Sequence, residues 1–273
     1  MILAAGEALV EIMRPRAGLP LDRPATFEGP FASGAPAIYA SVAARLGAST
    51  ALVAAVGDDP FGSLLRTRLA ADGVDVSRVR VTEQPTGCAF VAYDDAGERT
   101  FVFHMGAAIT EADLGDAPER AEWLHVSGST LTLSDRMGAT IAAAAERVLA
   151  AGGRVSLDPN ARGTPSPRLR AIAERAAVLF PSEGELEALA ISPRPEQVVC
   201  TTLGARGVRI GAETIPAPSV DEVDPTGAGD TFAAAFTVAT LGGAEPVEAA
   251  RAAVPVAAAA VTRLGPAEGD VSP

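Results

Sequence analysis

Short, nearly unbroken apolar runs recur along the chain and are separated by longer stretches of helical character. Residues 2–5, 51–56 and 123–127 are such runs, and each predicts a strand that is buried on both faces. Residues 135–151 predict a helix that ends at a pair of glycines, and residues 155–157 predict the next strand. This strand–helix–strand order favours an α/β fold with a mostly parallel sheet and right-handed crossovers. The carboxyl ends of its strands are expected to carry the ligands.

A second pattern predicts a small sheet apart from the main layers. Residues 88–93 and 99–103 are rich in β-branched and aromatic residues and flank a turn with glycine, which is typical of a β-hairpin. Residues 14–30 are rich in proline and glycine and poor in helix signals, so we expect irregular chain with short strands there. Segments at about 11–32 and 86–105 are therefore expected to form one small sheet together.

A glycine turn followed by an apolar helix lies near the carboxyl end of the chain. Residues 224–232 read Asp-Pro-Thr-Gly-Ala-Gly-Asp-Thr-Phe, and the apolar residues that continue to position 241 predict a buried helix. Thr226 is its predicted N-cap. A helix that begins at such a turn presents backbone amides and the positive end of its dipole, which suits an anion such as phosphate.

Asp230 follows this turn directly, at a place where a carboxylate would repel a phosphate. One explanation is catalytic, because the carboxylate can accept the proton of an alcohol that attacks the phosphate. The other explanation is structural, because the helix dipole favours an aspartate in the first turn. The Gly-Ala-Gly-Asp tetrapeptide alone leaves both explanations open.

Composition limits the classes of function that fit. The chain has 273 residues, enough for one substantial core, and 48% of them are apolar. A formal charge of −12 argues against a nucleic-acid or anionic-membrane binder, although amides and Mg²⁺ can still hold phosphates. Cys88 and Cys200 lack metal-ligand spacing, so reduced thiols in a cytoplasmic protein are expected. Glu7 interrupts the first apolar run, which argues against a secretory signal, and residues 252–261 are too short for a membrane span.

The motif at 224–232 resembles the carboxyl-terminal signature of the ribokinase-like (PfkB) carbohydrate kinase family. Gly-Asp-Asp-Pro-Phe-Gly at 57–62 and Thr-Leu-Gly-Ala-Arg-Gly at 202–207 resemble two further motifs of that family, in the family's order. The resemblance implies an α/β fold, a three-layer αβα sandwich with a mostly parallel sheet, in one kinase domain over residues 1–273. It also implies that the small sheet is a lid over the sugar, which would exclude water from the reaction.

The same resemblance implies the catalytic centre and the residues around ATP. The anion hole is expected at Gly227, Ala228 and Gly229, with Asp230 as the catalytic base. The residues expected at ATP are Ser182, Glu185, Thr202, Gly204, Gly207 and Thr226. Glu185 is expected to help bind Mg²⁺, although Ser182 stands where the family has asparagine. Asp224 is expected beside a monovalent cation such as K⁺.

The residues expected at the sugar are implied in the same way. They are Glu11, Gly34, Tyr93, Asn160, Arg162 and Asp230. An ionised Glu11 can accept hydrogen bonds from two neighbouring hydroxyls, and Arg162 can pair with a phosphate or a carboxylate. In the structural alternatives, Glu11 is a solvated acid at a strand edge, Asn160 belongs to a simple turn and Arg162 is solvated.

Three segments bear on the identity of the sugar. Ser-Gly-Ala-Pro-Ala-Ile at 33–38 resembles a branch of ketose kinases that includes tagatose kinases, and Ser33 and Ile38 replace the family's usual glycine and sugar-binding asparagine. Asp-Pro-Asn-Ala-Arg at 158–162 resembles branches that act on fructose-like and 2-keto-3-deoxygluconate substrates. Residues 103–107 lack the arginine that a keto-acid substrate would need at the lid.

The predicted function is an ATP-dependent kinase that phosphorylates a hydroxyl of a monosaccharide or sugar acid. One alternative is a sugar- or nucleotide-binding regulator without activity, which the changes at Ser33, Ile38 and Ser182 motivate. Another is a nucleoside kinase of the same family. A dinucleotide-dependent dehydrogenase is disfavoured because no Gly-x-Gly-x-x-Gly follows the first predicted strand. The expected partners are a small-molecule sugar and ATP, and a homodimer is left open.

Overall fold

Two sheets of unequal size organise the chain in the computed structural model, which describes residues 1–110, 112–160, 166–266 and 268–269. The strands of the larger sheet are β1 (Ile2–Ala5), β4 (Thr50–Gly57), β5 (Val74–Asp75), β6 (Val79–Thr82), β9 (Trp123–Ser127), β10 (Arg154–Asp158), β11 (Val178–Leu179), β12 (Val198–Thr202), β13 (Val208–Ile210) and β14 (Glu213–Ile215). Their order is β14-β13-β12-β11-β10-β9-β1-β4-β5, with β6 also paired to β4. All pairs are parallel except those that β13 makes with β12 and β14.

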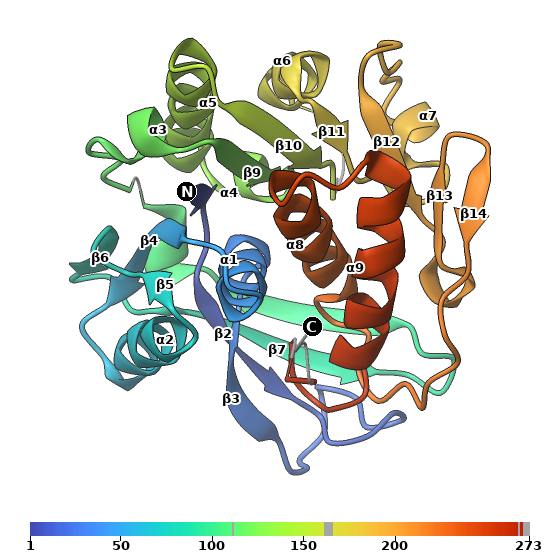
Figure 1. Ribbon diagram of the computed structural model, residues 1–273. Coiled ribbons are helices and arrows are strands. Elements are labelled where there is room, and N and C mark those ends of the chain that lie inside the picture. The colour runs from blue at the N-terminus through green and yellow to red at the C-terminus, as the bar shows by residue number, and fades with distance from the viewer. Residues whose placement is uncertain (111, 161–165, 267, 270–273) are drawn as a thin grey trace.

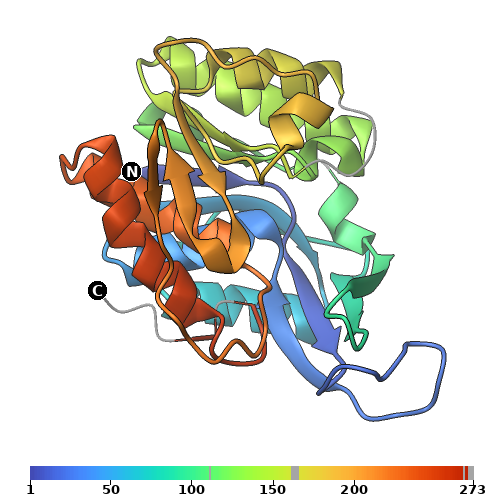
Figure 2. The same cartoon turned by 90° about the vertical axis from the view of Figure 1, so that its right-hand side faces the viewer.

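Helices cover both faces of the larger sheet, as Figures 1 and 2 show. One face carries α1 (Ala35–Arg45), α2 (Pro60–Ala71), α8 (Ala228–Leu241) and α9 (Pro246–Ala260). The other carries α3 (Ala117–Arg120), α4 (Thr130–Leu133), α5 (Asp135–Ala150), α6 (Pro167–Arg175) and α7 (Glu185–Ala188). The short 3₁₀ helices are η1 (Gly106–Ile109) and η2 (Gly204–Arg206). The predicted α/β sandwich is therefore confirmed.

The strand residues alternate between the two cores. In β1, Ile2 and Ala4 enter the cluster under α1 and α8, whereas Leu3 and Ala5 enter the cluster under α5. Because both sides are covered, such strands are apolar without interruption, which is why runs like 2–5 and 51–56 predicted them. The predicted boundaries agree with the observed strands to within about a residue.

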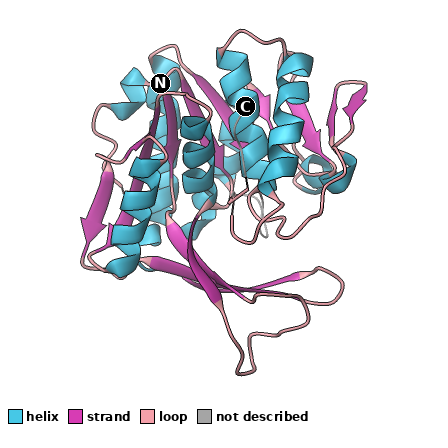
Figure 3. Ribbon diagram, turned by 60° about the horizontal axis from the view of Figure 1, so that its bottom comes forward, coloured by secondary structure: helices cyan, strands magenta, loops and turns pink. Residues whose placement is uncertain are grey.

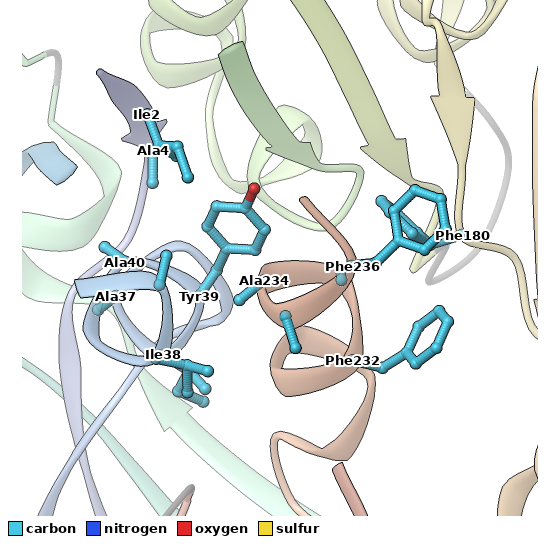
Figure 4. Close-up of a cluster of buried hydrophobic side chains, with 14 of the residues drawn as sticks. Ile2, Ala4, Ala37, Ile38, Tyr39, Ala40, Phe180, Phe232, Ala234 and Phe236 are labelled. Carbon is cyan, nitrogen blue, oxygen red and sulfur yellow. The ribbon is translucent and has the colours of Figure 1, made fainter. Parts of the chain in front are cut away.

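Aromatic packing anchors α8, the helix that follows the glycine turn. The ring of Phe180 lies 6.0 Å from that of Phe232 and 5.4 Å from that of Phe236, both nearly perpendicular (Figure 4). Edge-to-face pairs of this kind contribute about 0.5–1.5 kcal/mol each beyond their burial. The start of α8 is thereby fixed against Phe180, which immediately follows β11.

The smaller sheet has the order β3-β2-β7-β8 and projects from the body of the molecule (Figure 3). Its strands are β2 (Leu9–Met13), β3 (Glu28–Ser33), β7 (Gly87–Tyr93) and β8 (Arg99–His104). The predicted hairpin is confirmed as β7 and β8, which pair antiparallel. Residues of the segments at 11–32 and 86–105 thus form one sheet, with β2 parallel to β7.

One predicted helix start differs from the observed one. The helix after the glycine turn begins at Ala228 and its N-cap is Gly227, so the prediction of Thr226 as N-cap is wrong. Residues 33–38 lie at the start of α1, which begins at Ala35 with Gly34 as N-cap. Within the described ranges, none of the helices combines the length and apolar character that crossing a membrane requires.

Candidate active site

The glycine turn and the start of α8 form one wall of a pocket of about 670 Å³. Gly227 has φ 80°, a left-handed conformation that glycine adopts without the strain of a Cβ atom. The chain then enters α8 at Ala228, and the first amides of a helix have no acceptor within the helix. Gly227, Ala228, Gly229 and Asp230 all line this pocket, which is the arrangement an anion hole requires.

Asp230 shares the pocket with other carboxylates. Its pKa is raised well above the ordinary value, chiefly because burial disfavours the charged form, and further by the negative charges of Asp158, Glu7 and Glu11. Arg99 acts in the opposite direction. A carboxylate with a raised pKa is a stronger base once ionised, which suits it to accept a proton from an alcohol.

Asp158 is a site residue that the sequence analysis did not select. It lies at the carboxyl end of β10, lines the pocket, and its Oδ1 accepts a hydrogen bond from the Asn160 amide at 3.0 Å. Burial, and then the charge of Glu185, raise its pKa to about 7. The available signal was its position, since it follows the apolar run 155–157 at the edge where ligands were expected.

Two buried glutamates form the end of the pocket beneath the small sheet. Glu11 in β2 is 5% exposed, and its Oε1 accepts a hydrogen bond from the Ser33 hydroxyl at 2.9 Å. Glu7 is 6% exposed, and its Oε2 accepts one from the Thr130 hydroxyl at 2.5 Å. The serine at position 33 therefore orients Glu11, and Glu7 is a second pocket carboxylate that the sequence analysis did not select.

The small sheet contributes three alternate residues of β8 to the pocket. Arg99, Phe101 and Phe103 all line it, and the two phenylalanine rings are nearly parallel with centroids 5.2 Å apart. Residues 103–107 lack the arginine that a keto-acid substrate would need at the lid, and Arg99, from earlier in the chain, is a cation that lines the pocket. Gly34 and Ile38 line the pocket from the start of α1.

Of three further residues predicted at the sugar, one lines the pocket, one does not, and one lies outside the described residues. Asn160 lines the pocket, and its side-chain amide lies 3.4 Å from the Ser127 hydroxyl. Tyr93 is not among the described residues that line the pocket, and its hydroxyl instead contacts Asp224 and Thr226. Arg162 lies outside the residues that the structure describes.

The residues predicted at ATP divide between this pocket and a neighbouring one of about 500 Å³. Ser182, Glu185 and Thr226 line the first, Gly204 and Gly207 line the second, and Thr202 lines both. The second pocket is mostly apolar, with Val208, Val220, Phe232, Val254 and Val261 among its walls. Ala228 and Gly229 line both pockets and so lie between them. This arrangement suits a ligand that has an apolar ring at one end and a charged chain at the other.

Glu185 keeps a defined position although Ser182 replaces the family's asparagine. Its Oε2 accepts hydrogen bonds from the Ser182 amide at 2.9 Å and from the Ser182 hydroxyl at 3.0 Å. Asp158 shares the pocket, so two sets of carboxylate oxygens face the region beside the anion hole. Such hard oxygen donors suit Mg²⁺, which retains water and binds through few protein groups. Across the described ranges, three or more metal-binding side chains do not gather in one cluster.

Asp224 is fully buried behind the glycine turn. Its Oδ1 accepts hydrogen bonds from the Tyr93 hydroxyl at 2.5 Å and the Thr226 amide at 3.0 Å. Its Oδ2 accepts one from the Gly265 amide at 3.0 Å. The carboxylate therefore joins the small sheet, the turn and the segment after α9.

The pfkB family carbohydrate kinase profile matches residues 29–272. The chain belongs to the pfkB family of carbohydrate kinases. A fructokinase of Salmonella typhimurium is 34% identical over 89% of this chain and 85% of its own length. A fructokinase of Rhizobium leguminosarum bv. trifolii is 34% identical over 85% of this chain and 77% of its own length.

Solved pfkB structures share the fold along almost the whole chain. A ribokinase II candidate from E. coli, solved with ATP and Mg²⁺, has a TM-score of 0.90 and 34% identity, covering 98% of this chain and 94% of its own. A fructokinase from Vibrio cholerae, solved with fructose, ADP and calcium, has a TM-score of 0.82 and 25% identity, covering 98% and 94%. This pfkB protein is accordingly a phosphotransferase of the sugar kinase class.

Proposed function

We propose that this chain transfers the γ-phosphoryl group of ATP to a hydroxyl of an uncharged sugar, with Asp230 as the general base. The observation that carries the proposal is the position of Asp230 in one pocket with the glycine turn at the start of α8. There the base and the anion hole face the same space, as transfer from a bound phosphate to a bound alcohol requires.

The chain's own residues account for the main steps. The amides at Gly227, Ala228 and Gly229 hold the transferring group and stabilise the charge that develops on it. Asp230 takes the proton of the attacking hydroxyl. Phe101 and Phe103 of the lid line the same pocket and limit the access of water to the reacting hydroxyl. Glu185 and Asp158 would hold Mg²⁺ beside the anion hole, where the metal would neutralise phosphate charge.

An uncharged acceptor is supported by the acidic side chains around it. Five carboxyl groups line the pocket, at Glu7, Glu11, Asp158, Glu185 and Asp230, whereas Arg99 is the one cation among the described lining residues. The raised pKa values of Asp158 and Asp230 favour their neutral forms, so an anion would be repelled by those of the five that are ionised. Two like charges about 6 Å apart, at an effective dielectric constant near 20, repel by about 3 kcal/mol. That is about a hundredfold in affinity, so a sugar acid or sugar phosphate is expected to bind poorly. Glu7 and Glu11 can instead accept hydrogen bonds from neighbouring hydroxyls.

ATP is proposed to lie across the two pockets. Its base would enter the apolar pocket beside Gly204 and Gly207, and its phosphates would pass Thr202 and Thr226 towards the anion hole. The fructokinase sequences and the nucleotide-bound pfkB structures similar to this chain support that assignment.

A nucleoside acceptor is the second candidate, and the stacked rings of Phe101 and Phe103 favour it. They line the same pocket as Glu7 and Glu11 and offer a flat apolar surface to a planar substituent on a sugar. A regulator without activity is less well supported. The serines that replace the family's usual residues still contact pocket glutamates, because Ser33 donates a hydrogen bond to Glu11 and Ser182 donates one to Glu185.

Several finer assignments belong to the proposal. A monovalent cation such as K⁺ beside Asp224 is supported by its buried carboxylate, whose hydrogen bonds within the described residues come from uncharged donors. A homodimer is supported by Phe27, which directly precedes β3, and by Val102 of β8, which are 40% and 44% exposed. A cytoplasmic location is supported by the free thiols Cys88 and Cys200. A single domain over 1–273, in which the small sheet moves as a lid, completes it.

The test is release of ADP with Mg²⁺-ATP over a panel of fructose, tagatose, ribose, adenosine, 2-keto-3-deoxygluconate and fructose 6-phosphate. We expect the highest kcat/KM for a neutral compound, with both anions at least about a hundredfold lower. A preferred anion would contradict the assignment of an uncharged acceptor. Adenosine as best acceptor would select the nucleoside alternative, and no ADP above the acceptor-free rate would select the regulator. Repeating the assay in K⁺ and in N-methylglucamine tests the cation, and light scattering tests the dimer.

A further inference from the structure

One side chain of the small sheet reaches the loop that precedes the anion hole. Tyr93 is the last residue of β7, and its hydroxyl lies 2.5 Å from Asp224 Oδ1 and 2.9 Å from Thr226 Oγ1. Both partners lie more than 130 positions further along the chain. Thr226 immediately precedes Gly227, so this contact ends one residue from the turn that faces the phosphate.

The direction of these hydrogen bonds follows from the groups involved. An ionised carboxylate can only accept, so the Tyr93 hydroxyl donates to Asp224. The single phenolic proton of Tyr93 is then engaged with Asp224. In the second hydrogen bond the Thr226 hydroxyl is therefore the donor and the Tyr93 oxygen the acceptor. Burial and the bond to Asp224 both raise the pKa of Tyr93, which keeps the phenol protonated and the direction fixed. The result is a chain of hydrogen bonds from Thr226 through Tyr93 to Asp224.

Asp224 also fixes the turn directly, since its Oδ1 accepts from the Thr226 amide as well. Thr226 is thus held at two points, its amide by Asp224 and its hydroxyl by Tyr93. Asp224 is fully buried and Thr226 is 6% exposed, so water does not readily replace either contact. A shift of the lid strand therefore acts on the residue before the anion hole.

We propose that Tyr93 is a positioning residue that holds the anion-hole turn in register with the lid. The phosphoryl group and the acceptor, which Glu11 of the same sheet binds, then meet in line only while β7 is seated against Asp224. This inference rests on the proposed function, because it assigns Tyr93 a role in that reaction. It places Tyr93 outside the sugar pocket, in contrast to the role expected from the sequence.

Tyr93→Phe is the direct test, because it removes the hydroxyl and keeps the ring. We expect kcat to fall at least about tenfold, since displacements of about 1 Å can cost about a hundredfold in rate. The KM values for the acceptor and for ATP are expected to change less than about threefold, because Tyr93 touches neither pocket among the described contacts. Steady-state kinetics of the full chain on its best acceptor measure both.

Val91→Ala is the matched control for a merely structural effect. Val91 is fully buried in the same strand, so its truncation weakens the packing of the small sheet without touching Asp224 or Thr226. We expect Val91→Ala to lower the melting temperature at least as much as Tyr93→Phe, with kcat within about threefold of the parent. Loss of kcat in proportion to lost stability in both variants would overturn the proposal.

Thr226 provides a second, independent pair of variants if Tyr93→Phe does not fold. Thr226→Ser keeps the hydroxyl that donates to Tyr93, and Thr226→Val removes it at nearly constant volume. We expect kcat of the valine variant to be about tenfold below that of the serine variant, because only the valine variant lacks the hydroxyl that donates to Tyr93. Equal kcat in the two, or normal kcat in Tyr93→Phe beside an active parent, overturns the inference alone. A parent chain that phosphorylates none of the acceptors overturns the proposed function and the inference with it.

Discussion

Two aspartates near the anion hole differ in what surrounds them, and that difference assigns their roles. Asp230 lies in the first turn of α8, where its neighbours include Asp158, Glu7 and Glu11. Asp158 accepts a hydrogen bond from the Asn160 amide, and the charge of Glu185 helps to raise its pKa. These surroundings support Asp230 as the proposed group between phosphate and acceptor, and Asp158 as a proposed neighbour of Mg²⁺.

Asp230→Asn keeps the shape of the side chain and removes its basicity. We expect kcat on the best acceptor to fall by about 10²–10⁴-fold, the usual contribution of a general base. ATP affinity measured by calorimetry should be retained or slightly increased, because a negative charge beside the phosphates is lost. A kcat within a few-fold of the parent would mean that Asp230 serves only the helix.

Glu11→Gln tests the sugar end of the pocket. The loss of a charged acceptor is expected to raise the acceptor KM by about 10- to 150-fold, which corresponds to about 1.5–3 kcal/mol. The KM for ATP should stay nearly constant, since Glu11 belongs to β2 of the small sheet and is not among the described residues that line the second pocket. Ser33→Ala is the matched control, because it removes only the hydroxyl that orients Glu11 and should give a smaller increase. Glu11 does not bind the acceptor if its KM is unchanged in the glutamine variant.

Asp158 makes stability depend on pH in a predictable direction. Its folded pKa of about 7 exceeds the unfolded value near 3.9, so between these values the folded chain holds the extra proton. Stability contributed by this group is therefore present below about pH 4 and is lost as the pH rises towards 7. We expect Asp158→Asn to gain about 1–3 kcal/mol over the parent between pH 4.5 and pH 8, with the figure reduced because the pocket is open to water. Urea unfolding at the two values measures it, and a constant difference would contradict the raised pKa.

Among the elements, α8 joins the core to the site. Its interior turns bury Phe232 and Phe236 against Phe180, while its first residues line the pocket as the proposed anion hole. The sequence predicted this helix from its apolar run, but it placed the N-cap at Thr226. The hydroxyl of Thr226 is used by Tyr93, a contact across 133 positions that local patterns do not contain. Gly227 takes the cap because the chain there requires a positive φ.

The two glycines of this turn are expected to respond oppositely to alanine. Gly227→Ala places a Cβ atom at φ 80°, which costs about 1–2 kcal/mol. Gly229 lies inside α8, and a Cβ atom there would come no closer than 3.8 Å to the Asp158 carboxylate, so alanine gains helix propensity of up to about 1 kcal/mol. Denaturant unfolding of both variants should show the first less stable and the second at least as stable as the parent. The reverse order would contradict the backbone conformation of the turn.

At the scale of the molecule, the sequence predicted the layers of the fold and the small sheet, but it predicted fewer of the residues that line the pocket. Buried parallel strands are apolar without interruption, and the hairpin at 88–103 is a local signal, so both could be recognised. Glu7 could not, because its role depends on Thr130, which lies 123 positions away and is brought to it by folding. The sequence analysis looked for a lid arginine only at 103–107 and so missed Arg99. Alternate residues of β8 line the pocket, and Arg99 is one of them, together with Phe101 and Phe103.

Binding of Mg²⁺-ATP should stabilise the whole fold, because the first of the two pockets is lined by residues from both halves of the chain. At a free concentration of 100 times Kd, the expected gain is about 2.7 kcal/mol, or about 5–11 °C in melting temperature for a chain of this size. Thermal scans with ATP, with and without Mg²⁺, measure this gain. Chelation of the metal with EDTA should abolish turnover and reduce the shift. Turnover that persists in EDTA would contradict the role of Mg²⁺.

The hydrogen bond from Gly265 to Asp224 bears on how the protein is made in the cell. Synthesis proceeds from the amino end, so the lid strands and most of the large sheet leave the ribosome well before residue 265. A chain interrupted after α9 would already contain Asp230 and the glycine turn, yet the carboxylate behind that turn would lack one of its donors. Incomplete chains that end before Gly265 are therefore expected to be poor catalysts.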